Sequence, residues 1–492
     1  MATIWINDVP QPVVEGTRLS DVLSRAPHPC GGKGICGKCR VRAIGVLSPL
    51  SREEERHLTA FEIADGMRLS CCTVVEGDCR VTLSTDTVMA VVTDGKTTSK
   101  ALSPTFAAYG VAVDIGTTTL AARLYNAAGH LLAQAGCVNP QAAFGADVLS
   151  RVGAAGEGND LTTPLQRAVN GLLSDLAGIA GIAPTAIDGV VITGNTAMLC
   201  LLTATDAGSL SRAPFALPCS FNETIAATSV GLTVLAPNRP VYLPPCAAAF
   251  IGADALCAAL ASGLDGKSTA LLADMGTNGE LLLSYNDTIF ACSTAAGPAF
   301  EGLGISCGMP AMAGAIDEVA LVNGCMTPHT IGGEKPIGIC GSGLVDAAAC
   351  LLATEEMDKS GCLDGTVTLC ENVFLTQEDI RALQQAKSAV SAGMQTLLHH
   401  ANVTADEVEN LYTAGGFGSR LNGRNAAAIG LIPRALTTHI QPVGNAALDG
   451  ASRLLLDANA QRRLSALAAK IQVVELATDP YFTEHFVKNM SF

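Results

Sequence analysis

The sequence lacks two features that would place the chain at a membrane or in a secretory route. No uncharged apolar run approaches the roughly 20 residues that a membrane-spanning helix needs. The opening stretch MATIWINDVP has no basic segment followed by an apolar core and a small-residue cleavage site, so no signal peptide is readable. We therefore expect no membrane partner and a cytoplasmic location.

The chain also lacks a surplus of positive charge. Its 492 residues include 30 Lys and Arg against 45 Asp and Glu, which gives a formal net charge of -15. Phosphate backbones select basic surfaces, so this balance disfavours nucleic acid and anionic membranes as partners. A protein or a small molecule is the expected partner, and the length suits two or three domains.

The cysteines are unevenly distributed. Most of the 18 are scattered singly through apolar stretches, as buried thiols of a reducing compartment are. Cys30, Cys36 and Cys39 instead form C-x5-C-x2-C with glycines between them. Glycines let a backbone wrap tightly and point its N–H groups at a thiolate-rich cluster. RLSCCT supplies a fourth thiolate from Cys71 or Cys72; if this run is a strand, only one of the two can face the loop.

This arrangement favours a [2Fe-2S] cluster over structural zinc, which prefers two closely spaced C-x2-C pairs. Zinc and merely reactive thiols stay open as alternatives. The flanking pattern predicts strands at 2–6 and 38–45, a helix at 18–26, and a helix-starting capping box at Ser51 and Glu54.

These features together resemble the β-grasp [2Fe-2S] ferredoxins over roughly residues 1 to 90. The resemblance implies that the cluster ligands are Cys30, Cys36, Cys39 and Cys71. Cys72 takes the polar position that follows the last ligand in that family, and we expect Cys72 and Cys79 to be packed or exposed thiols.

The rest of the chain contains an internal duplication. VDIGTTTL and ADMGTNGEL share D-[IM]-G-T, and Tyr-Asn follows each aspartate after eleven residues, at Tyr125 and Tyr285. A second pair of similar segments is GVVITGNTAML and NLYTAGGFGSRL. A third pair consists of the small-residue helices expected in PCAAAFIGADALCAALAS and in QPVGNAALDGASRLLLDA. Shared motifs with one strand rhythm indicate two copies of one unit, which predicts two lobes around a cleft.

The chemistry of the repeat points to nucleotide phosphates. A glycine turn lets main-chain N–H groups approach a phosphate closely, and neighbouring hydroxyl or amide groups add contacts. Mg2+ keeps several waters and takes few carboxylates, so Asp114 and Asp274 at the two strand ends are its candidate ligands. The candidate phosphate-binding residues are Gly116, Thr117, Thr118, Thr119, Gly276, Thr277 and Asn278.

This pattern resembles the actin, sugar-kinase and heat-shock-chaperone ATPase superfamily over residues 110 to about 460. The resemblance implies that Asp254, on the first connecting helix, matches a position that often orients water. It also makes YTAGGFGSRL the adenosine motif, with Gly415, Gly416 and Gly418 as contacts. Ser342 is a further candidate, because Gly341-Ser342-Gly343 is expected to start a helix near the nucleotide.

The predicted fold class is α+β and α/β, a β-grasp [2Fe-2S] ferredoxin domain followed by a duplicated ribonuclease-H-like two-lobed ATPase. The expected divisions are the ferredoxin-like domain at 1–87, a flexible linker at 88–109, the first ATPase lobe at 110–265 and the second at 266–492.

An iron-sulfur centre needs no ATP to pass an electron downhill, so the fusion implies a poor electron acceptor. Each uphill step of about 59 mV costs a one-electron couple about 1.4 kcal/mol, and a few hundred millivolts need on the order of 5 kcal/mol or more. A plant-type cluster sits near roughly -400 mV, which bounds the unaided donor. ATP can bridge the gap by closing the lobes and stabilising an acceptor state that is easier to reduce.

The whole combination resembles the reductive activators of corrinoid-dependent methyltransferases, and NPQAAFGADVLSR, STAAGPAFEG and GICGSGLVDA look like signatures of that family. The resemblance implies ATP-dependent, one-electron reduction of inactive Co(II) corrinoid to Co(I). Its expected cofactors are a [2Fe-2S] cluster, ATP and Mg2+, and its partners a corrinoid protein and an electron-donor protein, with a homodimer left open. A ferredoxin-fused small-molecule kinase, a redox-sensing chaperone and an activator of a dehydratase are the alternatives.

Overall fold

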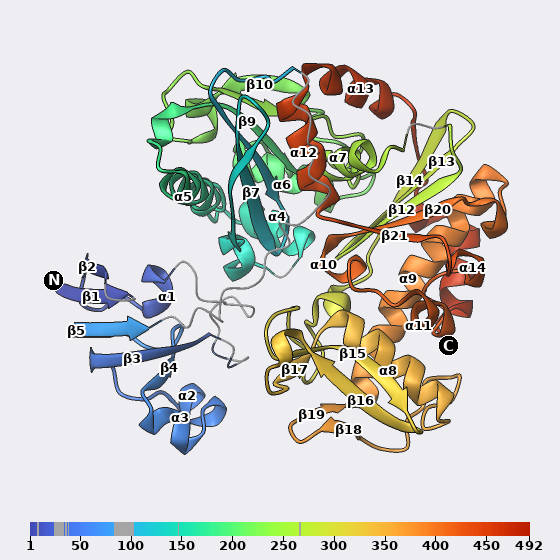
Figure 1. Cartoon of the computed structure of the whole chain (residues 1–492), viewed down its shortest axis with the longest axis horizontal. Helices are drawn as coiled ribbons and strands as arrows, with labels where there is room; N and C mark the ends of the chain where they lie inside the picture. The colour runs from blue at the N-terminus through green and yellow to red at the C-terminus, as the bar shows by residue number, and fades with distance from the viewer. Residues whose placement is uncertain are drawn as a thin grey trace.

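The computed structural model describes residues 1–6, 9–23, 34, 37, 39–82, 103–145, 147–264 and 267–492. Two of the four predicted cluster ligands, Cys30 and Cys36, lie outside the described residues, as do positions 88–102 of the expected linker. The described segments form a small amino-terminal domain, blue in Figure 1, and two larger lobes.

The amino-terminal domain is built on one five-stranded sheet in the order β2-β1-β5-β3-β4. Its strands are β1 (Ala2–Ile6), β2 (Val9–Val13), β3 (Arg40–Leu47), β4 (Met67–Leu69) and β5 (Val75–Thr82). Strand β1 runs parallel to its neighbour β5, whereas β3 runs antiparallel to β5. Alternate residues of β3 and β5, including Val41 and Val81, face a core over which α1 (Leu19–Val22) packs. This topology confirms the predicted β-grasp fold.

The capping box predicted at Ser51 is confirmed at the start of α2 (Arg52–His57), which is followed by α3 (Ala60–Ala64). The Glu54 backbone N–H donates to Ser51 Oγ at 3.2 Å, and the Ser51 N–H donates back to the Glu54 carboxylate at 2.9 Å. Two otherwise unpartnered donors of the helix end are thereby satisfied.

The first lobe holds a six-stranded sheet in the order β10-β11-β9-β6-β7-β8. Its elements are β6 (Tyr109–Ile115), β7 (Thr119–Asn126), β8 (Leu131–Val138), α4 (Val148–Gly156), α5 (Thr162–Ala180), β9 (Ile187–Gly194), α6 (Thr196–Leu202), β10 (Glu223–Ala226), β11 (Pro240–Leu243) and α7 (Ala253–Ser262).

The second lobe has a six-stranded sheet in the order β21-β20-β12-β13-β14-β22, whose first five strands match β11-β9-β6-β7-β8 of the first lobe. Its sheet strands are β12 (Ala270–Met275), β13 (Gly279–Tyr285), β14 (Thr288–Thr294), β20 (Asn410–Ala414), β21 (Ile440–Gly444) and β22 (Ile471–Val473). In each lobe the first three strands pair antiparallel, and the first also pairs parallel with a later strand, β9 or β20. The shared order and directions confirm the predicted duplication.

The second lobe also carries a subdomain between β14 and β20, seen below the main sheet in Figure 1. It comprises β15 (Ala315–Val322), β16 (Cys325–Thr330), β17 (Gly338–Ile339), α8 (Gly341–Ala353), β18 (Val367–Cys370) and β19 (Val373–Leu375). The helix that follows, α9 (Gln377–Ala401), packs on β13 and β14, as α5 packs on β7 and β8 in the first lobe. The remaining helices are α10 (Gly415–Gly418), α11 (Gly423–Ala428), α12 (Ala446–Leu456), α13 (Ala458–Ala468) and α14 (Pro480–Lys488). The duplication did not predict this insertion.

The two small-residue helices, α7 and α12, pack against each other between the lobes. Their contact is so close that a Cβ atom at Gly450 of α12 would overlap the backbone of Cys257 in α7. One apolar core includes both helices together with side chains of both sheets, such as Ala112 and Leu272. Small residues therefore permit the backbone contact that joins the lobes.

A buried ion pair fixes α12 to the first lobe. Arg123 of β7 and Asp449 of α12 are 2.6 Å apart, with side chains only 1% and 6% exposed, and the Tyr125 hydroxyl donates to Ser452. Just before β6, the Thr105 N–H donates to the Leu455 carbonyl at 2.9 Å. The last residues of the expected linker are therefore bound to α12.

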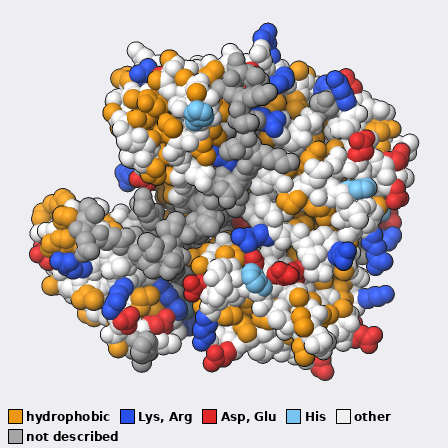
Figure 2. Space-filling view, in the orientation of Figure 1, with side chains coloured by type: hydrophobic (Ala, Val, Ile, Leu, Met, Phe, Trp, Pro, Cys, Tyr) orange, Lys and Arg blue, Asp and Glu red, His pale blue; other side chains and the backbone are white. Residues whose placement is uncertain are grey.

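Figure 2 shows Lys, Arg, Asp and Glu side chains interspersed over the visible face of the described residues. Within that part of the chain, no helix has the length and apolar character needed to cross a membrane.

We predict that Arg123→Met destabilises the ATPase lobes by about 3–5 kcal/mol, because the Asp449 charge stays buried without its partner. Arg123→Met combined with Asp449→Leu should recover most of this loss, since no lone charge remains buried. Urea unfolding followed by circular dichroism measures both variants. Arg167→Met, at an exposed position of α5, is the control, and an equal loss in that variant would contradict the role of the pair.

Candidate functional site

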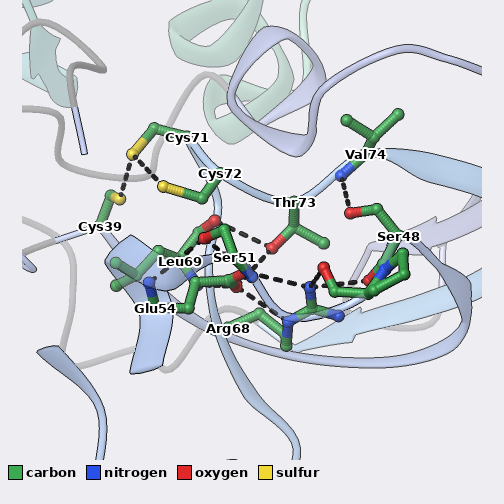
Figure 3. Close-up of polar contacts among 11 residues, drawn as sticks. Cys39, Ser48, Ser51, Glu54, Arg68, Leu69, Cys71, Cys72, Thr73 and Val74 are labelled. Atoms are coloured by element: carbon green, nitrogen blue, oxygen red, sulfur yellow. Dashed lines mark hydrogen bonds and ion pairs between the residues drawn. The ribbon is translucent and has the colours of Figure 1, made fainter. Parts of the chain in front are cut away.

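The structure brings together the two predicted cluster ligands that it describes. Cys39 lies just before β3 and Cys71 follows β4, and their Sγ atoms are 3.2 Å apart. Both side chains are buried. In Figure 3 the Cys71 sulfur lies between those of Cys39 and Cys72.

The prediction that Cys71 and Cys72 lie in one strand and face opposite ways is wrong. Strand β4 ends at Leu69, and the two cysteines lie in a turn in which the Cys72 N–H donates to the Leu69 carbonyl at 2.8 Å. Strand alternation does not apply in a turn. The Cys72 sulfur is 3.6 Å from that of Cys71, and a Cβ atom built on Gly34 would lie 3.2 Å from it. Cys79 is instead buried in the sheet core.

The thiol pair has the chemistry of a metal ligand set. The hydrogen bond between the Cys39 and Cys71 thiols lowers the pKa of Cys39 to about 6, and the same bond together with burial raises the pKa of Cys71. The thiolate is the form that binds metal, so one of the two sulfurs is poised as a ligand and a metal ion would replace the proton on the other. Soft sulfur donors suit iron-sulfur clusters and zinc alike.

A buried carboxylate fixes the turn that carries Cys71 (Figure 3). Glu54, fully buried, accepts hydrogen bonds from Arg68 Nε at 2.8 Å, from the Leu69 N–H at 3.0 Å and from the Thr73 hydroxyl at 2.9 Å. Burial alone would raise the pKa of Glu54, but the bonds from Arg68, Ser51 and Leu69 outweigh it and lower the pKa to about 2. The carboxylate thus contacts both sides of the cysteine turn as an anion.

We predict that Glu54→Gln destabilises the ferredoxin-like domain by about 3–5 kcal/mol, because Arg68 then lacks its buried counter-charge. Iron content should fall as the cysteine turn loosens. Unfolding of the full chain can be followed by the fluorescence of Trp5, the sole tryptophan, which lies in β1. Glu53→Gln makes the same charge change on the exposed side of α2 and should leave both measurements unchanged.

The second site lies where the two lobes face each other. The turn between β6 and β7 and the turn between β12 and β13 are each closed by a glycine N–H, from Gly116 to Thr119 O at 2.9 Å and from Gly276 to Asn278 O at 3.0 Å. A Cβ atom at Gly116 would lie 2.7 Å from Thr119 O, so the first turn requires glycine. The hydroxyls of Thr118 and Thr277 project from these turns onto one shared acceptor, described below.

The other predicted nucleotide contacts have different surroundings. Gly415 begins α10 with φ of +78°, and a Cβ atom on it would lie 2.9 Å from Asp274 Oδ1. The adenosine motif therefore abuts the second phosphate turn, and Gly416 and Gly418 follow within α10. Ser342 is buried at the start of α8, and its hydroxyl donates to the Asp317 carbonyl at 2.9 Å. Its contact with nucleotide stays a prediction.

Four half-buried carboxylates lie close enough in this cleft to repel one another. Burial raises the pKa of Asp114, Asp254 and Asp274 to about 7, and mutual repulsion contributes in each case. Burial, together with the charges of Asp254 and Asp274, also raises the pKa of Glu280. Asp114 accepts a hydrogen bond from Asn445 Nδ2 at 2.9 Å. The three aspartates that the sequence singled out are thus brought within electrostatic reach of one another.

Half-buried carboxylates that have no salt-bridge partner among the described residues fit a divalent cation. Among the residues that the structure describes, no three acidic, cysteine or histidine side chains converge closely enough to enclose a metal by themselves. Mg2+ does not need such a cage, because it usually takes one or two carboxylates and completes its shell with phosphate oxygens and waters. Asp114 and Asp274 fit this limited role.

Sequence reasoning did not identify several residues of the cleft. Asn195 and Asn445 cap the starts of α6 and α12, and each follows a glycine in a G-N-x-A segment that the two lobes share. Asn195 Nδ2 also lies 3.1 Å from Thr117 Oγ1. Glu301 and Arg151 end the conspicuous stretches STAAGPAFE and NPQAAFGADVLSR, but nothing local in those stretches indicates their contacts.

The raised pKa values predict an unusual pH dependence for the nucleotide-free protein. An aspartate whose pKa rises from about 3.9 to about 7 on folding contributes stability at low pH, and that stability is lost as the pH rises through 7. We expect the melting temperature to fall between about pH 4 and pH 7, the interval between the unfolded and the folded pKa. Asp114→Asn should flatten this dependence, whereas Mg2+ should counteract the fall at high pH. A melting temperature that rises steadily across this range would contradict the raised pKa values.

Three family models match consecutive parts of the chain. Residues 6–76 match a 2Fe-2S iron-sulfur cluster binding domain. Residues 109–267 match the RACo middle region, and residues 268–492 match the C-terminal domain of RACo, described as the ASKHA domain.

Relatives of known role are similar to most of the chain. The corrinoid activation enzyme RamQ of Eubacterium limosum is 34% identical over 418 residues, which cover 78% of this chain and 70% of that protein. A Methanosarcina barkeri reductase, named for a Co(II) methylated amine-specific corrinoid protein, is 29% identical over 281 residues, 52% of each chain. The solved structure of a reductive activator for corrinoid, iron-sulfur protein matches with a TM-score of 0.72 and 26% identity, over 100% of this chain and 98% of that one.

Fold, thiol pair and cleft together define a two-lobed ATPase of the actin, sugar-kinase and heat-shock-chaperone class joined to a [2Fe-2S] ferredoxin domain. Within that class, the chain belongs to the family of reductive activators of corrinoid proteins.

Proposed function

We propose that this chain uses ATP to reduce the Co(II) corrinoid of a partner protein to Co(I), one electron at a time. The observation that carries the proposal is the presence in one chain of a buried thiol pair and of two facing phosphate turns with buried carboxylates. The family supports the same activity, since its members named above act on corrinoid proteins.

The ferredoxin-like domain holds the electron carrier. Cys39 and Cys71, with Cys30 and Cys36, are the proposed ligands of a [2Fe-2S] cluster, which supplies one electron at low potential. That electron converts Co(II) to Co(I), and an electron-donor protein must then reduce the cluster again. Glu54 and Arg68 hold the Cys71 turn in place through this cycle.

The cleft holds the nucleotide. Backbone N–H groups of the turns at Gly116 and Gly276 are the proposed phosphate donors, with hydroxyls from Thr118 and Thr277. Asp114 and Asp274 are the proposed Mg2+ ligands, and Asp254 at the start of α7 is the residue proposed to orient water.

The α7–α12 contact connects nucleotide binding to a change in shape. The glycine contact between these helices and the apolar core around them join the lobes. A nucleotide that contacts both phosphate turns favours the closed arrangement of the lobes by its differential affinity for that state. Moving an equilibrium from 1:99 to 99:1 takes about 5.5 kcal/mol, which is the scale of the uphill electron transfer. Closure on the corrinoid partner is therefore the proposed use of ATP.

The direct test mixes the reduced protein, Mg-ATP and candidate corrinoid proteins anaerobically and records the Co(I) spectrum. We expect Co(I) to form only when all three are present. Equal reduction of cobalt without nucleotide would overturn the proposal, as would isolation of the protein with zinc in place of iron.

Two variants should separate the centres. Cys71→Ser should lose iron and Co(I) formation but keep ATP binding, because the thiols pack in a cluster separate from the core of α7 and α12 between the lobes. Asp114→Asn should keep iron but lose ATP-dependent reduction, because it removes a proposed Mg2+ ligand. Cys72→Ser is the matched control, and it should keep both activities. Iron analysis, nucleotide titration and the Co(I) spectrum report these outcomes, and joint loss of both functions in both variants would contradict separate centres.

A further inference from the structure

Glu301 lies between the two phosphate turns, at the end of the short helical segment Pro298–Glu301. The Thr118 hydroxyl of the first lobe donates to Glu301 Oε2 at 3.0 Å, and the Thr277 hydroxyl of the second lobe donates to the same oxygen at 2.7 Å. The second turn also approaches the other carboxylate oxygen, because a Cβ atom on Gly276 would lie 3.3 Å from Glu301 Oε1. One carboxylate thus joins the turns of both lobes.

We propose that Glu301 makes the cleft select the magnesium complex of the nucleotide over the free nucleotide, by holding with its own negative charge the hydroxyls that a phosphate would use. This inference rests on the proposed function, because it takes these turns as the phosphate site. It assigns Glu301 as a positioning and specificity-determining residue.

A bound phosphate and Glu301 use the same hydroxyl donors. A carboxylate oxygen and a phosphate oxygen are the same kind of acceptor, and each hydroxyl has only one proton to donate. A phosphate that takes the Thr118 and Thr277 protons must therefore displace Glu301 Oε2. Nucleotide and Glu301 compete for one pair of donors.

The negative charge of Glu301 also acts on the phosphates. Like charges repel far more strongly in a partly buried site than in water, so a phosphate brought against the Glu301 carboxylate is disfavoured. Mg2+ between the carboxylates and the phosphates reverses this balance, because it attracts both. The free nucleotide brings no such cation, so the charge of Glu301 lowers the affinity for free nucleotide more than the affinity for its magnesium complex.

A cationic neighbour is present for the displaced carboxylate. Arg151 of α4 is buried and interacts electrostatically with Glu301 and Asp147. Its Nε donates to the Gly145 carbonyl at 2.9 Å, and its Nη1 faces the Met198 sulfur at 3.9 Å, a weak acceptor. The guanidinium therefore retains donor capacity for Glu301 once the threonine hydroxyls turn to phosphate.

The test is a calorimetric titration of the full-length protein with ATP, once with excess Mg2+ and once with EDTA. Glu301→Gln keeps an oxygen acceptor for both threonines but removes the charge. We expect this variant to bind free ATP about ten times more tightly than wild type, while its affinity for Mg-ATP changes by about two-fold or less. The preference for the magnesium complex therefore shrinks.

Two further variants make the result specific. Glu301→Asp keeps the charge, so we expect it to keep the wild-type preference for Mg-ATP even though its shorter side chain reaches the hydroxyls less well. Glu318→Gln makes the same charge change at an exposed position of β15 and should behave as wild type. Thermal unfolding establishes that each variant is folded before titration.

An unchanged preference in Glu301→Gln would overturn the inference, and so would weaker binding of both nucleotide forms. If Glu301→Gln does not fold, the aspartate variant decides, because loss of the preference with the charge retained would also overturn it. If the wild-type protein binds Mg-ATP but substitution of Glu301 leaves the preference for Mg-ATP over free ATP unchanged, this inference alone is refuted. Wild-type protein that binds neither form refutes the nucleotide site and the proposed function with it.

Discussion

The burial of like charges between the two lobes is the constraint on which the ATPase depends. Asp114, Asp254 and Asp274 lie in a low-dielectric cleft, and among the described residues none of them has a salt-bridge partner. A buried carboxylate without a counter-ion retains its proton instead of its charge, which is why the pKa of each is raised to about 7. The raised pKa values mean that a divalent cation that binds these carboxylates competes with protons.

The ferredoxin-like domain shows the opposite solution to the same problem. Glu54 is fully buried, whereas the cleft aspartates are partly exposed, yet Arg68 and several hydrogen bonds lower the pKa of Glu54 to about 2. A fully satisfied buried network stabilises a single geometry, here the turn that presents Cys71 to Cys39. The chain thus uses a compensated carboxylate where a fixed ligand set is needed, and uncompensated carboxylates where a ligand must be admitted.

Features set by local chemistry were predictable from the sequence. The Ser51 capping box, the glycine turns after Asp114 and Asp274, and the repeated strand order each depend on residues close in sequence. The side on which Cys72 lies was not predictable, because β4 ends at Leu69, where the backbone N–H turns to the carboxylate of Glu54 from another element.

Contacts between residues far apart in the sequence could not be predicted, because no local pattern connects such residues. Glu301 accepts a hydrogen bond from Thr118, which lies 183 positions earlier in the sequence, so no local pattern connects the two residues. The insertion between β14 and β20 has no counterpart in the first lobe, and the duplication therefore could not indicate it. The binding of residues 103–105 to α12 likewise depends on a helix more than 300 positions away, so composition alone could not place the end of the linker.

The separation of the cores bears on where the energy of ATP is used. The core of the ferredoxin-like domain, which includes Val41 and Val81, shares no residue with the core that contains α7 and α12. Packed cores transmit strain to their own neighbours, because they are dense and nearly incompressible. Within the described part of the chain, no helix or strand of the ferredoxin-like domain packs extensively against an element of the lobes, so lobe closure acts on what the lobes hold and not on the surroundings of Cys39 and Cys71. A mechanism that makes the acceptor easier to reduce agrees with this architecture better than one that makes the cluster a stronger reductant.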